Sequence, residues 1–178
     1  MSRCNGATTT ALVVEHANRL NDWLRGQGVE AMIWGDMLLG PGEAADAAHA
    51  KTLAEAEARR AAISTNIIVV DWHYVASADA RSLAILQKAG FRVVAASWYT
   101  PENIRHLAQA ALATGAEGLL QTTWMGYFPD ARAMKSQLQQ FTAFVLAAEY
   151  AWSGRNDAPT QLGYDPKEVF LTAYGRDR

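Results

Sequence analysis

Four short apolar segments, each closed by a tryptophan, constrain the fold of this chain more than any other feature of its sequence. The segments cover residues 29–34, 66–72, 91–98 and 116–124, and they end at Trp34, Trp72, Trp98 and Trp124. The second reads Asn-Ile-Ile-Val-Val-Asp-Trp, a β-branched run that is typical of a strand covered on both faces. Successive tryptophans lie 38, 26 and 26 residues apart, which is about the length of one strand and one helix.

Helical patterns separate these segments. The spacing of apolar residues predicts helices over residues 12–24, 43–62, 79–90, 101–114 and 131–152, and a short helix near 166–174. The fourth helix has the clearest punctuation, with Thr100 as N-cap, Pro101 in the first helical position and Gly115 as the C-terminal stop. In the last long helix, the residues expected to face inward are Met134, Leu138, Phe141, Phe144, Val145 and Ala148.

This order of elements defines a fold class. Strict alternation of apolar strands and helices is typical of parallel strands joined by right-handed crossovers. The sequence therefore predicts an α/β protein with a parallel four-stranded sheet of βα repeats. Residues 1–154 are expected to form one βα domain, and residues 155–178 are expected to form a tail whose short helix packs on it.

Composition excludes several classes of protein. The formal net charge of −2 and the absence of a basic run argue against nucleic acid as a partner, because phosphate neutralisation needs clustered Lys and Arg. The single cysteine, Cys4, excludes an internal disulfide framework. No apolar stretch approaches the roughly 20 residues of a membrane-spanning helix, and residues 1–6 contain no signal-peptide core. A soluble globular protein is expected, with its compartment left open.

Motifs for cofactors and metals are also missing from the sequence. It contains no G-x-G-x-x-G fingerprint and no P-loop, and no two histidines have the i, i+4 spacing of a metal-binding helix. The three residues His73, Asp71 and Asp36 are too little evidence for a zinc site. Neither a metal nor a cofactor is therefore expected.

The candidate ligand-binding residues lie at the ends of the predicted strands. In parallel α/β folds the carboxyl ends of the strands converge on one face, where ligands bind. The predicted binding residues are Trp34, Asp36, Asp71, Trp72, His73, Trp98, Tyr99, Trp124 and Tyr127. Flat aromatic walls with a few carboxylates and donors suit a sugar, whose C–H faces stack on aromatic rings while its hydroxyls need directed hydrogen bonds.

Other aromatic and imidazole side chains are expected to have ordinary structural roles. Trp23 and Trp152 fall within predicted helices and are interpreted as packing residues. His16, His49 and His106 also fall within helical stretches and are interpreted as histidines of the surface or the core edge. A single tryptophan at a strand end is more often a core residue than a surface on which a ligand stacks. The prediction of a binding site therefore depends on all four tryptophans standing at equivalent strand ends.

Several stretches, taken together and in order, resemble a known family. They are Arg3-Cys4-Asn5-Gly6, residues 15–20, residues 32–39 with Trp34-Gly35-Asp36, Asp71-Trp72, residues 90–94 and residues 118–124. This set resembles the C-terminal half of the catalytic barrel of family 20-like glycoside hydrolases, the β-N-acetylhexosaminidases and their relatives. The resemblance implies a sheet equivalent to strands 5–8 of a TIM barrel, since a complete (β/α)₈ barrel takes about 250 residues.

The resemblance also implies which functional groups the chain holds. In that family an Asp-Glu pair at the end of the fourth strand supplies the general acid and orients the substrate's acetamido group, which acts as nucleophile. That pair would fall upstream of Met1, and Gly126 stands where the family has a late acidic residue. By resemblance, the four strand-end tryptophans would wall the sugar pocket, and Asp36 and Tyr99 would bond hydroxyls or the acetamido group. No catalytic residue is therefore expected in this chain.

Three functions remain open from the sequence. The first is the C-terminal half of a sugar-hydrolysing barrel, inactive by itself. The second is a non-catalytic carbohydrate-binding or self-associating half-barrel module, because open sheet edges favour pairing into a homodimer or larger oligomer. The third is an unrelated α/β enzyme, for which the sequence offers no nucleophile elbow, phosphate loop or metal motif.

Overall fold

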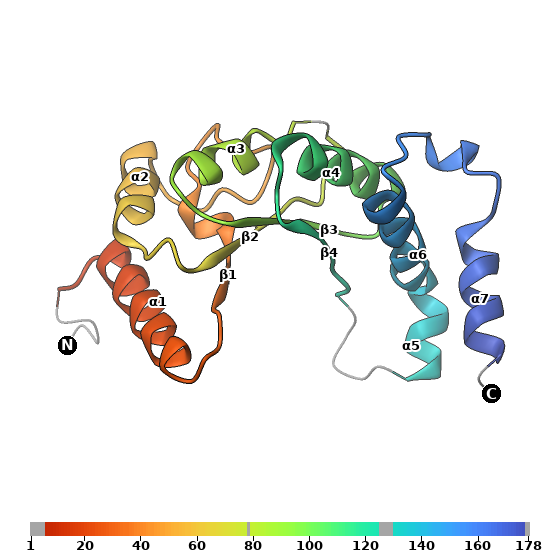
Figure 1. The fold of residues 1–178 in the computed structure, drawn as a ribbon, viewed down its shortest axis with the longest axis horizontal. Coiled ribbons are helices and arrows are strands. Elements are labelled where there is room, and N and C mark those ends of the chain that lie inside the picture. The colour runs from red at the N-terminus through yellow and green to blue at the C-terminus, as the bar shows by residue number, and fades with distance from the viewer. Residues whose placement is uncertain (1–5, 78, 125–129, 177–178) are drawn as a thin grey trace. The chain divides into compact units, whose positions relative to one another are not determined.

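The computed structural model describes residues 6–77, 79–124 and 130–176 (Figure 1). The chain divides into two compact units. The N-terminal unit consists of Met1–Trp72 and Arg81–Val94, and the C-terminal unit consists of His73–Ala80 and Ala95–Arg178. The sequence-based division into a βα domain over residues 1–154 and a tail over residues 155–178 stays a prediction.

The strands form one four-stranded parallel sheet. In sheet order they are β1 (Met32–Trp34), β2 (Ile68–Trp72), β3 (Val93–Ser97) and β4 (Gly118–Gln121). Met32 lies opposite Ile68 and Trp34 lies opposite Val70 in the parallel pair of β1 and β2. Helices connect the successive strands, so the predicted α/β class with a sheet of βα repeats is confirmed, and the architecture is consistent with half of a TIM barrel.

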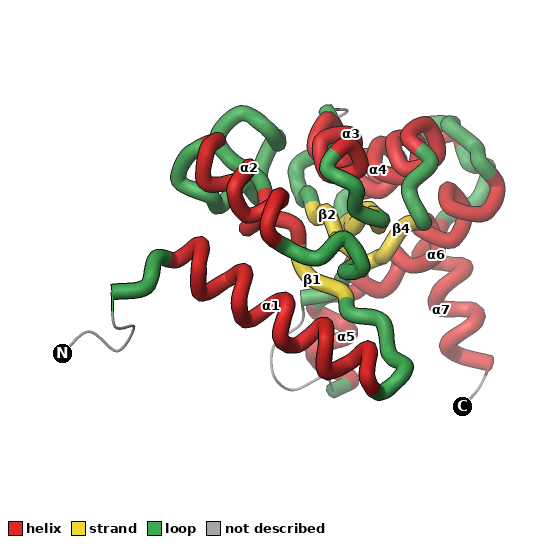
Figure 2. The backbone as a smooth tube through the Cα atoms, turned by 60° about the vertical axis from the view of Figure 1, so that its left-hand side comes forward, coloured by secondary structure: helices red, strands yellow, loops and turns green. Residues whose placement is uncertain are grey.

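The N-terminal unit places three helices and a 3₁₀ turn around its strands. They are α1 (Thr9–Gly26), η1 (Gly35–Leu38), α2 (Leu53–Ala62) and α3 (Arg81–Lys88). Figure 2 shows the loop that leads from the end of α1 into β1. Asn18 on α1 fixes that helix to the end of α2, because its amide donates to the carbonyl of Ala62 at 2.9 Å and accepts from the backbone N–H of Ser64 at 2.9 Å.

The predicted helix over 43–62 is wrong in its first half, because residues before α2 form turns and bends. The Glu43 carboxylate accepts from the Gly40 N–H at 2.8 Å and from both terminal nitrogens of Arg60 at 2.8 and 2.9 Å. A helix would carry Glu43 away from these partners, which are buried or nearly so. The helix begins instead where the Thr52 hydroxyl accepts from a first-turn N–H, as an N-cap does.

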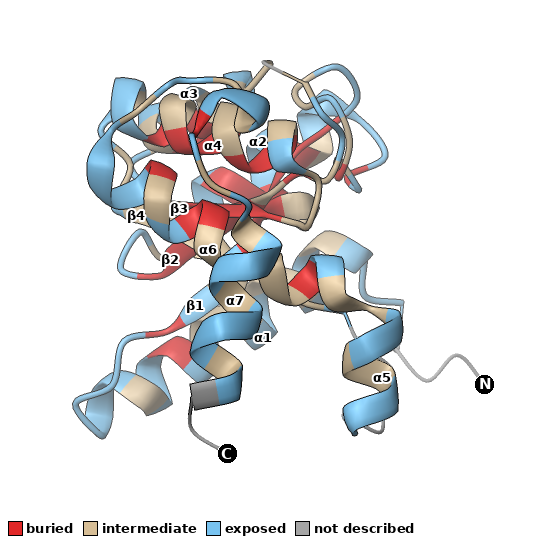
Figure 3. Cartoon of the chain, turned by 90° about the vertical axis from the view of Figure 1, so that its right-hand side faces the viewer, coloured by how far each residue is buried: buried red, intermediate tan, exposed pale blue. Residues whose placement is uncertain are grey.

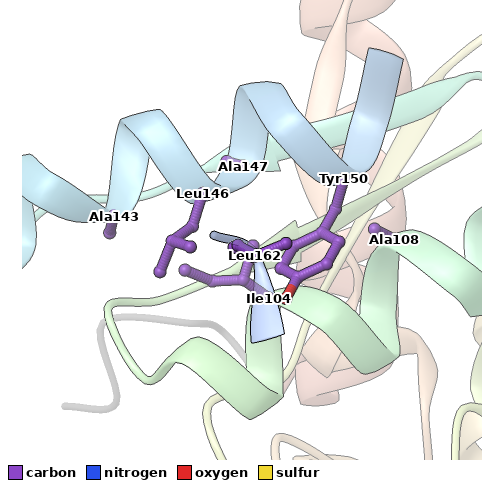
Figure 4. Packing of buried hydrophobic residues seen from close by; sticks show 7 residues of the cluster. All are labelled: Ile104, Ala108, Ala143, Leu146, Ala147, Tyr150 and Leu162. Carbon is purple, nitrogen blue, oxygen red and sulfur yellow. The ribbon is translucent and has the colours of Figure 1, made fainter. Parts of the chain in front are cut away.

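The C-terminal unit is built around helix α6. Its helical elements are α4 (Pro101–Thr114), α5 (Ala131–Ser136), α6 (Leu138–Ser153), η2 (Pro159–Gln161) and α7 (Pro166–Arg176). One hydrophobic cluster joins α4, α6 and the segment after η2, and Figure 4 shows its members Ile104, Ala108, Ala143, Leu146, Ala147, Tyr150 and Leu162. On another face of α6, the Phe141 ring lies 5.8 Å from the ring of Phe170 on α7.

The predicted single helix over 131–152 is interrupted, and its inward face differs from the expected one. The backbone of Gln137, at φ −120° and ψ 28°, separates α5 from α6. The buried residues of α6 are Gln140, Ala143, Leu146, Ala147 and Tyr150. Phe144, which was expected inside, is exposed. The apolar pattern alone misplaced this face because the inward position at the first turn belongs to a polar residue, Gln140.

Two tryptophans predicted as packing residues are instead exposed. Trp23 on α1 is 64% exposed and Trp152 on α6 is 90% exposed, so most of each side chain lies outside the core. Helix α6 directs its buried face toward α4, which leaves the position of Trp152 outward. Figure 3 shows that the outer faces of α5 and α7 are exposed as well.

Candidate ligand-binding site

An aromatic cluster lies at the ends of the strands in the C-terminal unit. We use this name for Tyr74, Trp98, Tyr99 and Trp124. The ring centroids of Trp98 and Tyr99 are 4.4 Å apart with the planes at 75°, and those of Tyr74 and Trp98 are 5.2 Å apart. The indole N–H of Trp124 donates to the hydroxyl of Tyr74 at 2.5 Å. Three of the four residues follow directly from the strand-end pattern, and Tyr74 connects two of them.

A buried amide on α4 fixes the backbone of this cluster. Asn103 accepts from the backbone N–H of Trp98 at 2.9 Å through Oδ1. Its Nδ2 donates to the carbonyl oxygens of His73 at 2.7 Å and Val75 at 3.0 Å. Asn103 is fully buried, so water does not compete for these bonds. The segment that carries Tyr74 and the residue after β3 are therefore held to the same side chain.

A second buried amide, Gln140 on α6, fixes the two tryptophans of the cluster. Its Oε1 accepts from the indole N–H of Trp98 at 3.2 Å and from the backbone N–H of Trp124 at 2.6 Å. Its Nε2 donates to the carbonyl of Trp124 at 3.2 Å and to Oε1 of Gln137 at 2.9 Å. Both indole N–H groups of the cluster thus have protein acceptors, and a ligand would meet the rings through their faces.

A short polar network lies beside the cluster at the ends of β3 and β4. The Ser97 hydroxyl donates to Oε1 of Gln121 at 2.8 Å, and the Gln121 amide donates to the carbonyl of Thr122 at 3.0 Å. The Thr122 hydroxyl is 2.8 Å from the Ser97 carbonyl oxygen and 3.4 Å from the Tyr74 hydroxyl. These groups add directed donors and acceptors next to the aromatic rings.

The N-terminal unit holds a separate polar group at the end of β1. Asp36, in η1, accepts from the indole N–H of Trp72 at 3.3 Å through Oδ1, and its Oδ2 is 2.7 Å from Nδ1 of His49. The imidazole also lies edge-on to the Trp72 ring, with centroids 6.1 Å apart. His49 was expected on a helix, and that prediction is wrong, because His49 lies in the loop before α2.

The loop that carries His49 is fixed along its length. The backbone N–H of His49 donates to the carbonyl of Asp36 at 2.8 Å, and that of Ala50 donates to the carbonyl of Leu39 at 2.9 Å. Ala47 has φ 49° and is the one non-glycine residue with a positive φ in the described part of the chain. Such a conformation is costly for an alanine and persists where the surroundings determine it, often next to functional groups.

Trp34 and Asp36 also border a groove of about 420 Å³ between α1 and β1. The α1 side of this groove is formed by Val13, His16, Ala17, Leu20 and Leu24. The indole of Trp34 is exposed there. The groove is mostly apolar and lies along the outer edge of β1, which pairs with β2 on its other side.

Two predicted binding residues are buried, and one lies outside the described residues. Asp71 is 1% exposed, and its Oδ2 accepts from the Ser82 hydroxyl of α3 at 2.6 Å. His73 is 3% exposed, and its backbone N–H donates to the carbonyl of Ala96 at 3.1 Å. Tyr127 belongs to the segment 125–129, which is outside the described residues.

The predicted residues therefore fall into two groups. Trp34, Asp36 and Trp72 gather in the N-terminal unit, and Trp98, Tyr99 and Trp124 gather in the C-terminal unit. The side chains that organise them but were not among the predicted binding residues are Tyr74, Asn103, Gln140 and His49. Of these four residues only Tyr74 follows a strand end, so the strand-end pattern points to Tyr74 and not to the other three.

In the described part of the chain, no cluster of three or more His, Cys, Asp or Glu side chains has an arrangement that could hold a metal ion. Over the same residues, no helix combines the length and the apolar character needed to cross a membrane. Comparison with protein families and with curated proteins gave no match to this chain.

Proposed function

We propose that this chain binds a sugar at the aromatic cluster, in the manner of the C-terminal half of a glycoside hydrolase that acts on N-acetylhexosaminides or related sugars. The observation that carries the proposal is the pairing of both indole N–H groups with protein acceptors, Gln140 and Tyr74. Indoles held in this way offer preformed ring faces, which suit the C–H surface of a pyranose.

Polar groups next to the rings support the same ligand class. Sugar hydroxyls need donors and acceptors within reach of the stacked ring, and Gln121, Thr122 and the Tyr74 hydroxyl lie side by side at the strand ends. Small-molecule sites commonly combine aromatic walls with a few placed polar groups.

We propose that the chain binds the sugar but does not hydrolyse it. Retaining and inverting glycosidases use a carboxylic acid to protonate the leaving oxygen. The carboxylates of the predicted site have other bonds: Asp71 is buried against Ser82, and Asp36 accepts from Trp72 and contacts His49. The chain alone is therefore expected to leave an aryl N-acetylglucosaminide uncleaved.

The test is a titration of the full chain with methyl β-N-acetylglucosaminide, followed by tryptophan fluorescence and by the NMR signals of the indole N–H groups. Saturable changes at Trp98 and Trp124, lost in Trp98→Ala, would support the proposal. Trp152→Ala is the matched control, because this tryptophan is exposed on α6 and makes no part of the cluster. Equal binding by both variants, or no saturable change in the wild type, would contradict it.

A second candidate function, self-association, is favoured by the burial of the strands. Met32 and Trp34 in the edge strand β1 are exposed, and the edge strand β4 is only half-buried, whereas β2 and β3 are mostly buried. Open edge strands are templates for pairing with another chain. Light scattering coupled to size-exclusion chromatography tests this: a dimer or larger oligomer is expected, and a monomer at micromolar concentration would exclude it.

A further inference from the structure

We propose that the groove between α6 and α7 binds a quaternary ammonium group, against its aromatic rings and beside the carboxylate that lines it. The groove has a volume of about 690 Å³ and lies wholly within the C-terminal unit. Its rings are those of Phe144, Trp152 and Tyr164, and its carboxylate is that of Glu149. The inference goes beyond the proposed sugar-binding function and does not depend on it, since the groove shares no lining residue with the aromatic cluster.

One face of α6 presents apolar side chains that the core does not use. Phe144, Ala148 and Trp152 follow one another at intervals of four residues and therefore share a face of the helix. Phe144 is 46% exposed and Trp152 is 90% exposed, although another face of the same helix is buried in the core. Figure 1 shows α7 beside α6, and Val169 of α7 borders the groove. Apolar side chains gathered in this way are typical of a binding surface.

The third ring of the groove is attached to the carboxylate. The hydroxyl of Tyr164 donates to Oε2 of Glu149 at 3.1 Å, and the Tyr164 ring packs against the hydrophobic cluster of α4 and α6. Burial and the Glu149 carboxylate raise the pKa of Tyr164 to about 12, so the phenol keeps its proton at neutral pH and remains the donor. Ring and carboxylate therefore border the groove as one preformed group.

The charges around the groove favour a cation. Oε1 of Glu149 is 3.6 Å from a terminal nitrogen of Arg155, and Nε of Arg155 donates to Asp157 at 2.7 Å. These two carboxylates and one guanidinium leave an excess of one negative charge at neutral pH. The stretch of residues 144–169 contains four carboxylates and only two basic side chains. Aromatic faces add to this preference, because the ring quadrupole attracts a cation within about 6 Å.

The apolar lining selects one class of cation. A primary ammonium has three donors and is strongly hydrated. Among the described residues that line the groove, the polar side chains are those of Glu149, Ser153 and Tyr164. Glu149 already accepts from Tyr164, and the Ser153 hydroxyl donates to the backbone carbonyl of Glu149 at 2.6 Å. A quaternary ammonium group has no donor to satisfy, and its methyl groups can contact the rings and Val169 without a lost hydrogen bond.

The test compares two probes of nearly the same shape, choline and 3,3-dimethylbutan-1-ol, which differ in the charge at the branched centre. Their methyl ¹H NMR signals report binding to the full chain. The choline signal is expected to show a saturable upfield shift, because its methyl groups lie over ring faces. Choline is also expected to bind about tenfold more tightly than the neutral alcohol. Equal affinity for the two probes, or no saturable binding of choline, would overturn the proposal.

Two variants test the ring and the carboxylate separately. Trp152→Leu removes an exposed ring but keeps an apolar side chain, and the affinity for choline is expected to fall about fivefold. Glu149→Gln keeps an acceptor for Tyr164 and removes the charge, so choline should bind about fivefold more weakly while the neutral alcohol binds as before. Leu112→Ala, at an exposed position of α4 outside the groove, is the control and should bind choline like the wild type. Unchanged choline affinity in either folded variant would contradict the assigned role.

A second copy of the chain is the other occupant that this apolar groove could accept. Size-exclusion chromatography with light scattering on Trp152→Leu distinguishes the two. An oligomeric state equal to that of the wild type supports a groove open to the ligand, whereas a wild-type dimer that dissociates in Trp152→Leu would overturn the proposal. Saturable binding of methyl β-N-acetylglucosaminide without any binding of choline would overturn this inference alone and leave the proposed function intact.

Discussion

The ion pair between Glu43 and Arg60 is expected to be the main attachment of the loop that carries His49. The side chains of Arg60 and Glu43 are 9% and 13% exposed, and two hydrogen bonds of 2.8 and 2.9 Å join them. Arg60 also donates to the carbonyl of Leu38 at 2.6 Å, while Glu43 accepts from the Gly40 N–H. Glu43→Gln keeps the shape of the side chain and removes the charge that balances a nearly buried guanidinium.

The magnitude follows from this burial. Removing one partner of a buried ion pair costs about 3–5 kcal/mol, because the other charge remains without compensation. Gln keeps one acceptor oxygen, so the lower end, about 3 kcal/mol, is expected for Glu43→Gln. For a chain of this length that corresponds to a fall in Tm of about 6–12 °C. Adding Arg60→Met to Glu43→Gln removes the uncompensated charge and is expected to restore part of the loss.

The assay is urea unfolding followed by far-UV circular dichroism, with Glu30→Gln as the matched control. Glu30 pairs with Arg92, but both side chains are largely exposed, and a loss below about 1 kcal/mol is expected there. A loss for Glu43→Gln that is as small as the control's would refute the reasoning, as would a double variant less stable than Glu43→Gln alone.

The same pair predicts a pH dependence. Burial raises the pKa of Glu43, but hydrogen bonds from Arg60 and Gly40 outweigh it and hold the pKa below its ordinary value of 4.5. A carboxyl whose pKa is lowered on folding stabilises the protein above its unfolded pKa, and this contribution disappears as the pH falls through the folded pKa. The stability difference between wild type and Glu43→Gln is therefore expected to shrink below pH 4.5.

Three further predictions concern the C-terminal unit. Gln140→Met removes the amide that holds the aromatic cluster and is expected to weaken sugar binding about tenfold by calorimetry, whereas exposed Gln139→Met leaves it unchanged. Burial and a neighbouring carboxylate raise the pKa of Tyr164 to about 12, and burial also raises the pKa of Tyr150. Ultraviolet titration should therefore find both tyrosines among the late ones, and the stabilisation from Tyr164 should be lost as the pH rises from 10 towards 12. Gly115→Ala, at φ +69°, should cost about 1–2 kcal/mol in urea unfolding, while Gly26→Ala, with no positive φ, should not.

The fold was predictable wherever local pattern and tertiary packing agree. The β-branched run of β2 specifies its strand, and Pro101 in the first turn and the left-handed Gly115 after the last turn specify the ends of α4, without distant partners. The loop before α2 was not predictable in this way, because Glu43 leaves the helix for a bond with Arg60, 17 residues away. Helix propensity is a weak preference that such a bond overrides.

The candidate site, like the fold, could be predicted from the sequence only in part. The strand-end tryptophans follow from parallel topology, and Trp98 and Trp124 are in one cluster as expected. The strand-end pattern does not separate Asp36 from Asp71, although Ser82 of α3 covers only the second. Neither His49 nor Gln140 has a local signal, since each reaches the site through a contact that the chain makes only after it has folded.

The two indole N–H groups that bond to Gln140 and Tyr74 have a thermodynamic consequence for any ligand of the cluster. A ligand that stacks on these rings displaces water from apolar faces and breaks no hydrogen bond of either indole. Its binding should therefore show a negative heat-capacity change. Stacking distinguishes poorly between sugars that differ in one hydroxyl. Discrimination between such epimers then depends on the polar groups around the rings, while the rings themselves supply affinity common to them all.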